Sequence, residues 1–137
     1  MRILGIDYGN RRTGVALSDE SEFLATALTT VKGSEPDEVA KRVAGLAKEH
    51  GAGAVVIGLP KNMDGSEGFR SEQTRAFGDK LSTLIPDVAI IYYDERMTTV
   101  AASGYMHEVG IKSKKQKGSI DMLAAKIILQ DYLDSKR

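Results

Sequence analysis

The chain begins with a strand-like pattern of hydrophobic and polar positions and then changes to a helical one. Three strands are predicted first, separated by turns rich in glycine, asparagine, serine and acidic residues: residues 2–7, 13–18 and 23–31. Their short connections predict antiparallel neighbours. Apolar positions then recur at helical spacing on one face, which carries Val39, Val43, Leu46 and Ala47.

The second half alternates strands with helices. The segment AVVIGLP is an uninterrupted apolar run, typical of a strand covered on both faces. We expect a helix over residues 69–85, stopped by Pro86, then a strand in VAIIYYDER, a helix beginning near Thr98 and a last helix over residues 119–134. The order βββαβαβαα predicts an α/β protein with a mixed five-stranded sheet and helices on both faces, because each parallel crossover needs a helix. This order matches the ribonuclease H-like fold.

Composition narrows the classes of function. The 137 residues, 42% of them hydrophobic, suffice for one core, and we predict a single domain over residues 1–137. Nineteen basic and nineteen acidic residues cancel, so any attraction for nucleic acid has to come from local patches. The absence of cysteine excludes disulfides, thiolate catalysis and sulfur-ligated zinc. No signal-peptide pattern and no run of about 18 apolar residues occurs, so we expect a cytoplasmic protein without membrane contact.

Acidic residues end two of the predicted strands. Asp7 ends the first, on the same pleat face as Gly5, where it either accepts hydrogen bonds from the following turn or serves a functional site. Asp94 and Glu95 end a later strand, and alternation sends them to opposite faces, so only one is expected to point to a site. The competing interpretation is that Asp94 caps the next helix or that Glu95 pairs with Arg96.

The last predicted helix carries Asp121 within its apolar stripe. At about 100° per residue, four apolar or aromatic residues fall within roughly 60° of it: Ala124, Ala125, Ile128 and Tyr132. An acid that faces the sheet favours a function, because a purely structural one would face water. Three inward carboxylates repel one another unless a cation joins them. Oxygen ligation by carboxylates suits Mg²⁺ or Mn²⁺, which promote phosphodiester hydrolysis.

Basic and glycine-rich segments near these acids offer contacts to phosphate. In DYGNRRTGVA, backbone amides near Gly9 and Gly14 can approach a phosphate and Arg11 and Arg12 can pair with it, although a hairpin that needs positive φ also explains the glycines. The candidate substrate-binding residues are Gly9, Arg11, Arg12 and Arg96, with a lysine cluster before the last helix: Lys112, Lys114, Lys115 and Lys117.

Other basic residues and one loop complete the predicted surface. Arg70 and Arg75 extend the basic rim, and GLPKNMDGSEG lies after a strand, where a substrate-facing loop is expected. Within that loop, Asn62 and Asp64 are better explained by turn formation. The chain shows no array of aromatic residues for stacking, so we expect it to read backbone shape more than base sequence.

Four segments together resemble the bacterial YqgF or RuvX family of Holliday junction resolvases and pre-16S rRNA nucleases: GIDYGNRRTGVA, VVIGLPKNMDGS, YYDERMTT and SIDMLAAKIILQDYL. The resemblance covers essentially the whole chain. It implies a ribonuclease H-like fold, a metal-dependent nuclease, and processing of the 5′ end of the small-subunit ribosomal RNA precursor. Matched motif by motif, it implies that Asp7, Glu95 and Asp121 are the catalytic and metal-binding acids. Asp94 stays open as the substitute for Glu95, because the phase of the strand is defined only to within one residue.

Several alternatives stay open from the sequence. Branched DNA is the competing substrate, and a junction resolvase needs two symmetry-related sites, which favours a homodimer, whereas trimming an RNA end needs only a monomer. The segment GIDYGNRRTGVA also looks like the first phosphate loop of the actin and sugar-kinase superfamily, but those enzymes close two lobes around ATP and this chain has one. A non-catalytic module that binds RNA or a ribosome-assembly partner is the third hypothesis.

Overall fold

The structure of the protein, a computed structural model, describes residues 1–98 and 117–137 and contains a five-stranded mixed sheet. Its strands are β1 (Arg2–Asp7), β2 (Arg12–Ser18), β3 (Ala25–Lys32), β4 (Ala52–Leu59) and β5 (Ala89–Asp94). They lie in the order β3-β2-β1-β4-β5. The first three pair antiparallel, whereas β4 runs parallel to both β1 and β5. The mixed five-stranded sheet predicted from the sequence is therefore confirmed.

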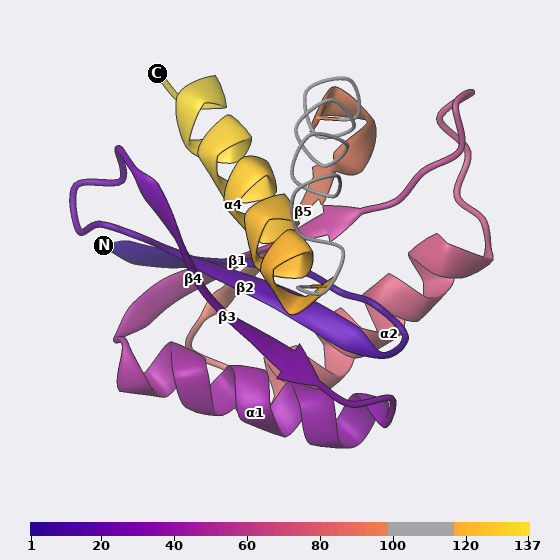
Figure 1. The fold of residues 1–137 in the computed structure, drawn as a ribbon, viewed down its shortest axis with the longest axis horizontal. Coiled ribbons are helices and arrows are strands. Elements are labelled where there is room, and N and C mark those ends of the chain that lie inside the picture. Colours follow the sequence, from indigo (N-terminus) through magenta and orange to yellow (C-terminus); the bar gives the residue numbers. More distant parts are fainter. Residues whose placement is uncertain (99–116) are drawn as a thin grey trace.

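Helices cover both faces of this sheet (Figure 1). On one face lie α1 (Pro36–Glu49) and α2 (Phe69–Leu84), which enclose the larger core with Leu4, Ile6 and Phe77. On the other face lies α4 (Lys117–Ser135), which packs on β1, β2 and β3 and encloses a second core. None of the helices in the described ranges is long and apolar enough to cross a membrane.

Several boundaries differ from the sequence prediction; for example, β2 begins at Arg12 instead of residue 13 and α4 begins at Lys117 instead of residue 119. The third strand begins at Ala25 instead of residue 23, because the Asp19 carboxylate accepts hydrogen bonds from the amides of Phe23 and Leu24 and holds both in the β2–β3 loop. After β5 the chain forms a 3-10 turn, η1 (Glu95–Thr98). The helix predicted to begin near Thr98 lies outside the described residues beyond that point.

Glycines on neighbouring strands let α4 approach the sheet closely. A Cβ atom at Gly5 would lie 2.6 Å from the Leu129 Cβ, and one at Gly58 would lie 2.7 Å from the Ile128 Cδ1. A Cβ atom at Gly14 would overlap the backbone carbonyl of α4 itself. These three missing side chains set the height of α4 above the sheet.

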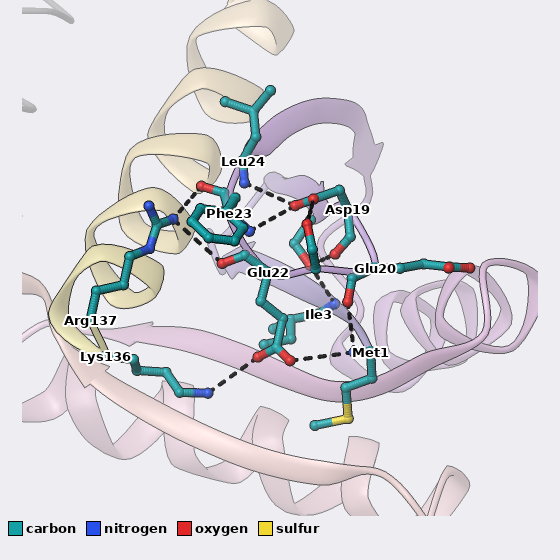
Figure 2. Close-up of polar contacts among 11 residues, drawn as sticks. Met1, Ile3, Asp19, Glu20, Glu22, Phe23, Leu24, Lys136 and Arg137 are labelled. Atoms are coloured by element: carbon teal, nitrogen blue, oxygen red, sulfur yellow. Dashed lines mark hydrogen bonds and ion pairs between the residues drawn. The ribbon is translucent and has the colours of Figure 1, made fainter.

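Both chain ends are tied to the β2–β3 loop (Figure 2). The N-terminal ammonium of Met1 lies 3.3 Å from the Glu22 carboxylate, and the Lys136 ammonium lies 3.2 Å from the other oxygen of the same group. The Arg137 guanidinium lies over the Phe23 ring, 4.3 Å from its centroid. These contacts hold the end of the molecule opposite to the carboxyl end of β1.

Candidate functional site

The carboxyl ends of β1, β4 and β5 meet at one edge because these strands are parallel. Asp7 is the last residue of β1 and Asp94 the last residue of β5. Glu95 follows Asp94 and begins η1. The strand alternation places Asp7 on the face that also carries Gly5, toward α4. The topology thus brings acids from two distant segments to one edge of the sheet.

Asp121 reaches the same edge through α4. Gly14 pairs with Asp7 in the register of β1 and β2, and the Asp121 carbonyl lies directly over Gly14. The Arg12 Nε donates a hydrogen bond to the Asp121 Oδ2 at 2.8 Å. The helix therefore positions Asp121 over the strand pair that ends in Asp7, as its place in the apolar stripe predicts.

The three acids interact electrostatically. The pKa of Asp7 is raised to about 7, first by burial and then by the nearby charges of Glu95 and Asp121, while Arg70 acts in the opposite direction. Burial also raises the pKa of Glu95, and Arg70 again opposes the shift. A carboxyl group that resists ionisation beside two others indicates a site that attracts a cation.

Asp94 and Glu95 have different surroundings. The Arg96 side chain donates hydrogen bonds to both carboxylate oxygens of Asp94, with the shortest at 2.7 Å, and the Arg96 amide donates to the same group at 3.0 Å. The side chain of Arg96 therefore pairs with Asp94, whereas the alternative considered from the sequence was a pairing of Glu95 with Arg96. Of these two acids, Glu95 is the one whose charge acts on Asp7, as expected if the two acids point to opposite sides.

Arg96 also contacts the loop of residues 60–68. Its Nη1 donates a hydrogen bond to the Met63 carbonyl at 3.2 Å. Gly65 has a φ of 90°, and a Cβ there would lie 3.3 Å from the Arg96 Nη1. Arg96 was expected to contact substrate; in the structure it links β5 to this loop.

The turn between β1 and β2 differs from the expected hairpin geometry. Neither Gly9 nor Gly14 has positive φ, so that explanation of the two glycines is wrong. Gly9 is needed because a side chain would strike the Arg12 carbonyl, and Gly14 because α4 lies above it. Arg11 is exposed, and its carbonyl accepts a hydrogen bond from the Gly33 amide at 2.9 Å.

The other predicted basic residues differ in how they relate to the acidic site. Lys112, Lys114 and Lys115 lie outside the described residues, and Lys117 begins the backbone of α4. Arg75 does not join the basic rim, because its Nε donates a hydrogen bond to Glu67 at 2.6 Å and its guanidinium lies over the Tyr92 ring. Arg70 does act on the acidic site, as its effect on Asp7 shows.

Comparison with models of protein families shows which family the chain belongs to. A family model described as RuvX, Holliday junction resolvase, matches residues 1–135. The chain belongs to this family. Among its relatives, a "Putative pre-16S rRNA nuclease" from Acetivibrio thermocellus is 50% identical over 99% of this chain and 97% of the relative. One of the same name from Roseiflexus sp. is 43% identical over 99% of this chain and 96% of the relative.

Solved structures with the same fold include resolvases. The fowlpox virus resolvase bound to Holliday junction DNA matches with a TM-score of 0.63 and 12% identity, covering 99% of both chains. The Thermus thermophilus RuvC complex with a Holliday junction substrate matches with a TM-score of 0.63 and 17% identity, covering 99% of this chain and 95% of the other. At these identities the likeness concerns the fold, and the ribonuclease H-like fold predicted for this RuvX chain is confirmed.

The donor set of this RuvX chain suits a hard divalent cation. All three candidate acids offer carboxylate oxygens, the ligands that Mg²⁺ and Mn²⁺ prefer. Across residues 1–98 and 117–137, however, no three acidic or histidine side chains lie close enough to hold one ion together. On the α4 side, Asp121 forms an ion pair with Arg12. The chemistry of the acids fits a metal, whereas Arg12 neutralises one of them in this structure.

The sequence pattern did not reveal two features of the site. The role of Gly14 depends on the pairing of β1 with β2 and on the height of α4, which no local motif encodes. Phe69 was expected only as the start of a helix, yet 72% of its surface is exposed. A large aromatic residue between a glycine-rich loop and an arginine was the available signal.

Proposed function

We propose that this member of the RuvX family is a metal-dependent nuclease that hydrolyses phosphodiester bonds of structured nucleic acid. The observation that carries the proposal is the partly buried carboxyl of Asp7, whose pKa is raised by burial and by the charges of Glu95 and Asp121. Such mutual repulsion is relieved when a divalent cation binds among the acids. Family membership and the names of the relatives support the same reaction class.

Asp7, Glu95 and Asp121 would hold Mg²⁺ or Mn²⁺. When bound, such an ion activates water for attack and neutralises negative charge on the reacting phosphate. The rigid end of β1 fixes Asp7, while the close contact of α4 with Gly14 fixes the backbone that carries Asp121. The Asp94 carboxylate is already hydrogen-bonded to Arg96, which favours Glu95 as the metal ligand after β5.

The basic residues would neutralise and orient the substrate. Arg12 lies 2.8 Å from Asp121, so it is close enough to the acids to pair with a phosphate once a cation takes over its role there. Arg11 is exposed on the same turn. The lysine cluster of Lys112, Lys114, Lys115 and Lys117 precedes the helix of Asp121 and remains a predicted phosphate contact.

We favour the 5′ end of the small-subunit ribosomal RNA precursor as the substrate, because the relatives at up to 50% identity are named for that activity. With this substrate we also propose a cytoplasmic location and ribosome-assembly factors as further partners. The family description names Holliday junction resolvase, which makes branched DNA the competing substrate. A resolvase has to present two sites and therefore to form a homodimer.

Replacing Asp121 with asparagine tests the proposal. We expect Asp121→Asn to abolish cleavage of a labelled RNA precursor while the circular dichroism spectrum and RNA binding stay close to wild type. Asp87→Asn is the matched control, since Asp87 is an exposed acid before β5 and should leave the cleavage rate unchanged. Full activity of Asp121→Asn would reject the mechanism. Binding by the wild type without any cleavage, in either Mg²⁺ or Mn²⁺, would favour the non-catalytic module.

A further inference from the structure

A hollow opens where β4 leads into α2. Its volume is about 300 Å³, and it is lined by Pro60, Lys61, Asn62, Gly68, Phe69 and Arg70. This volume lies at the lower end of the range of small-ligand sites, about 300–1,000 Å³. The hollow is therefore large enough to receive one compact chemical group.

The walls of the hollow are held by internal hydrogen bonds. The buried hydroxyl of Ser71 donates to the Pro60 carbonyl, which joins the start of α2 to the end of β4. The Asn62 amide donates to the Ser66 carbonyl at 2.9 Å, and the Gly65 amide donates to the Asn62 carbonyl at 2.9 Å. The loop of residues 60–68 is thus closed on itself, so the hollow is formed before any ligand binds.

An aromatic ring and two cations line this hollow together. Phe69 is 72% exposed, and a single exposed apolar residue is ordinary on a protein surface. Here, however, Lys61 and Arg70 line the same hollow, so two cationic side chains lie beside the ring. An exposed ring with adjacent cations is the combination by which proteins bind an unstacked base and its phosphates.

The hollow lies next to the acidic site. Leu59 pairs with Asp94 in the register of β4 and β5, so Pro60 and Lys61 leave the sheet beside the strand that delivers Glu95. The Arg70 charge acts on both Asp7 and Glu95. A nucleotide in the hollow would therefore be adjacent to a phosphate held at the acids.

We propose that this hollow is a subsite for one unpaired nucleotide of the substrate strand, with the base stacked on Phe69 and its phosphates between Lys61 and Arg70. The proposal rests on the proposed nuclease function for the identity of the bound strand as substrate. It specifies the substrate class: the strand is single-stranded beside the cut, in RNA or in DNA. A continuous duplex cannot place a base on Phe69, because its bases are already stacked.

The test measures binding without cleavage. Oligonucleotides of RNA and of DNA, single-stranded or as blunt duplexes and labelled with fluorescein, are titrated with the full-length protein in EDTA. We expect Phe69→Ala to weaken single-strand binding about tenfold and duplex binding less than twofold, and Phe69→Tyr to restore it. Phe23→Ala is the matched control, because Phe23 is also exposed, at 59%, but lies in the β2–β3 loop, at the other edge of the sheet from the end of β4. Lys61→Gln and Arg70→Gln should each make the slope of log affinity against log salt concentration less steep, by the amount that corresponds to about one phosphate contact.

The outcomes separate the subsite from the nuclease. A selective loss on single strands, of either sugar type, supports the subsite, and quenching of a 2-aminopurine base that disappears in Phe69→Ala supports stacking. Unchanged single-strand binding by Phe69→Ala, an equal loss on duplexes, or no single-strand binding by the wild type overturns it. If Phe69→Ala binds and cuts like the wild type, the subsite alone is rejected; if single strands bind through Phe69 and no metal-dependent cleavage occurs, the nuclease alone is rejected.

Discussion

At the scale of single residues, Asp7 shows how the fold creates chemical reactivity. Its carboxyl ends a buried strand and shares its surroundings with Glu95 and Asp121, so ionisation is unfavourable without a cation. The same unfavourable ionisation that raises the pKa of Asp7 to about 7 also provides the attraction for a metal. The site therefore reduces the stability of the metal-free protein in exchange for affinity for a cation.

The stability of the metal-free protein should fall as Asp7 ionises. Because the folded-state pKa of about 7 lies above the ordinary value of 3.8, the contribution of Asp7 to stability is most favourable below about pH 4 and becomes less favourable as the pH rises from about 4 to 7. Asp7→Asn should raise the free energy of unfolding in EDTA by about 1–3 kcal/mol at pH 8 and have little effect at pH 4. Urea denaturation at both pH values measures the difference. An equal effect at the two pH values would show that ionisation of Asp7 is not costly in the folded state.

At the scale of elements, the contact between β2 and α4 sets the position of the site. Gly14 is the point where the helix backbone meets the sheet, and Asp121 belongs to the turn that makes this contact. The ion pair of Arg12 with Asp121 adds a second connection between the same two elements. The position of the carboxylate thus depends on a packing distance as well as on its own residue.

Adding a methyl group at Gly14 should displace α4. Because an alanine Cβ would overlap the Asp121 carbonyl, Gly14→Ala is expected to destabilise the protein by about 1–3 kcal/mol or more and to lower cleavage by about a hundredfold. The matched control is Gly45→Ala, an exposed position in α1 with open space around it, which should stabilise the helix by about 0.5–1 kcal/mol. Thermal unfolding and cleavage rates measure both. Wild-type cleavage by a folded Gly14→Ala variant would contradict the role of this contact.

Arg96 should act as a positioning residue between β5 and the loop of residues 60–68. Arg96→Ala removes the bonds to Asp94 and to the Met63 carbonyl, so we expect about tenfold slower cleavage and faster proteolysis within the loop. Lys80→Ala is the control, since it removes an exposed ion pair with Asp37 that should contribute less than about 1 kcal/mol. If Arg96→Ala showed wild-type cleavage and proteolysis, the connection would have no functional role.

Much of this element-scale picture could be predicted from the sequence. The alternation of strand and helix patterns predicted the order of the elements. The apolar stripe of the last helix, α4, indicated that Asp121 faces the sheet. The position of Arg96 could not be predicted, because Asp94 and Glu95 both neighbour it and only the turn after β5 decides between them. The role of Gly14 was equally hidden, since it arises from a contact between residues 107 positions apart that local patterns do not record.

At the scale of the whole molecule, the charges are balanced overall and separated locally. Nineteen acidic and nineteen basic residues cancel. The acids at the carboxyl edge are flanked by Arg12 and Arg70, and both chain ends are tied down at the other end of the molecule. This arrangement suits a protein that binds a phosphate backbone at one edge without a general affinity for polyanions.

Cleavage by the whole protein tests the central claim most directly. A labelled precursor of small-subunit ribosomal RNA and a four-way DNA junction are incubated with the wild type and with Asp7→Asn, in Mg²⁺, Mn²⁺ or EDTA. We expect cleavage of the RNA that requires a metal ion and disappears in Asp7→Asn, with less cutting of the junction. Equal cleavage by both proteins, or cleavage that persists in EDTA, would contradict a metal-dependent nuclease built on Asp7, Glu95 and Asp121.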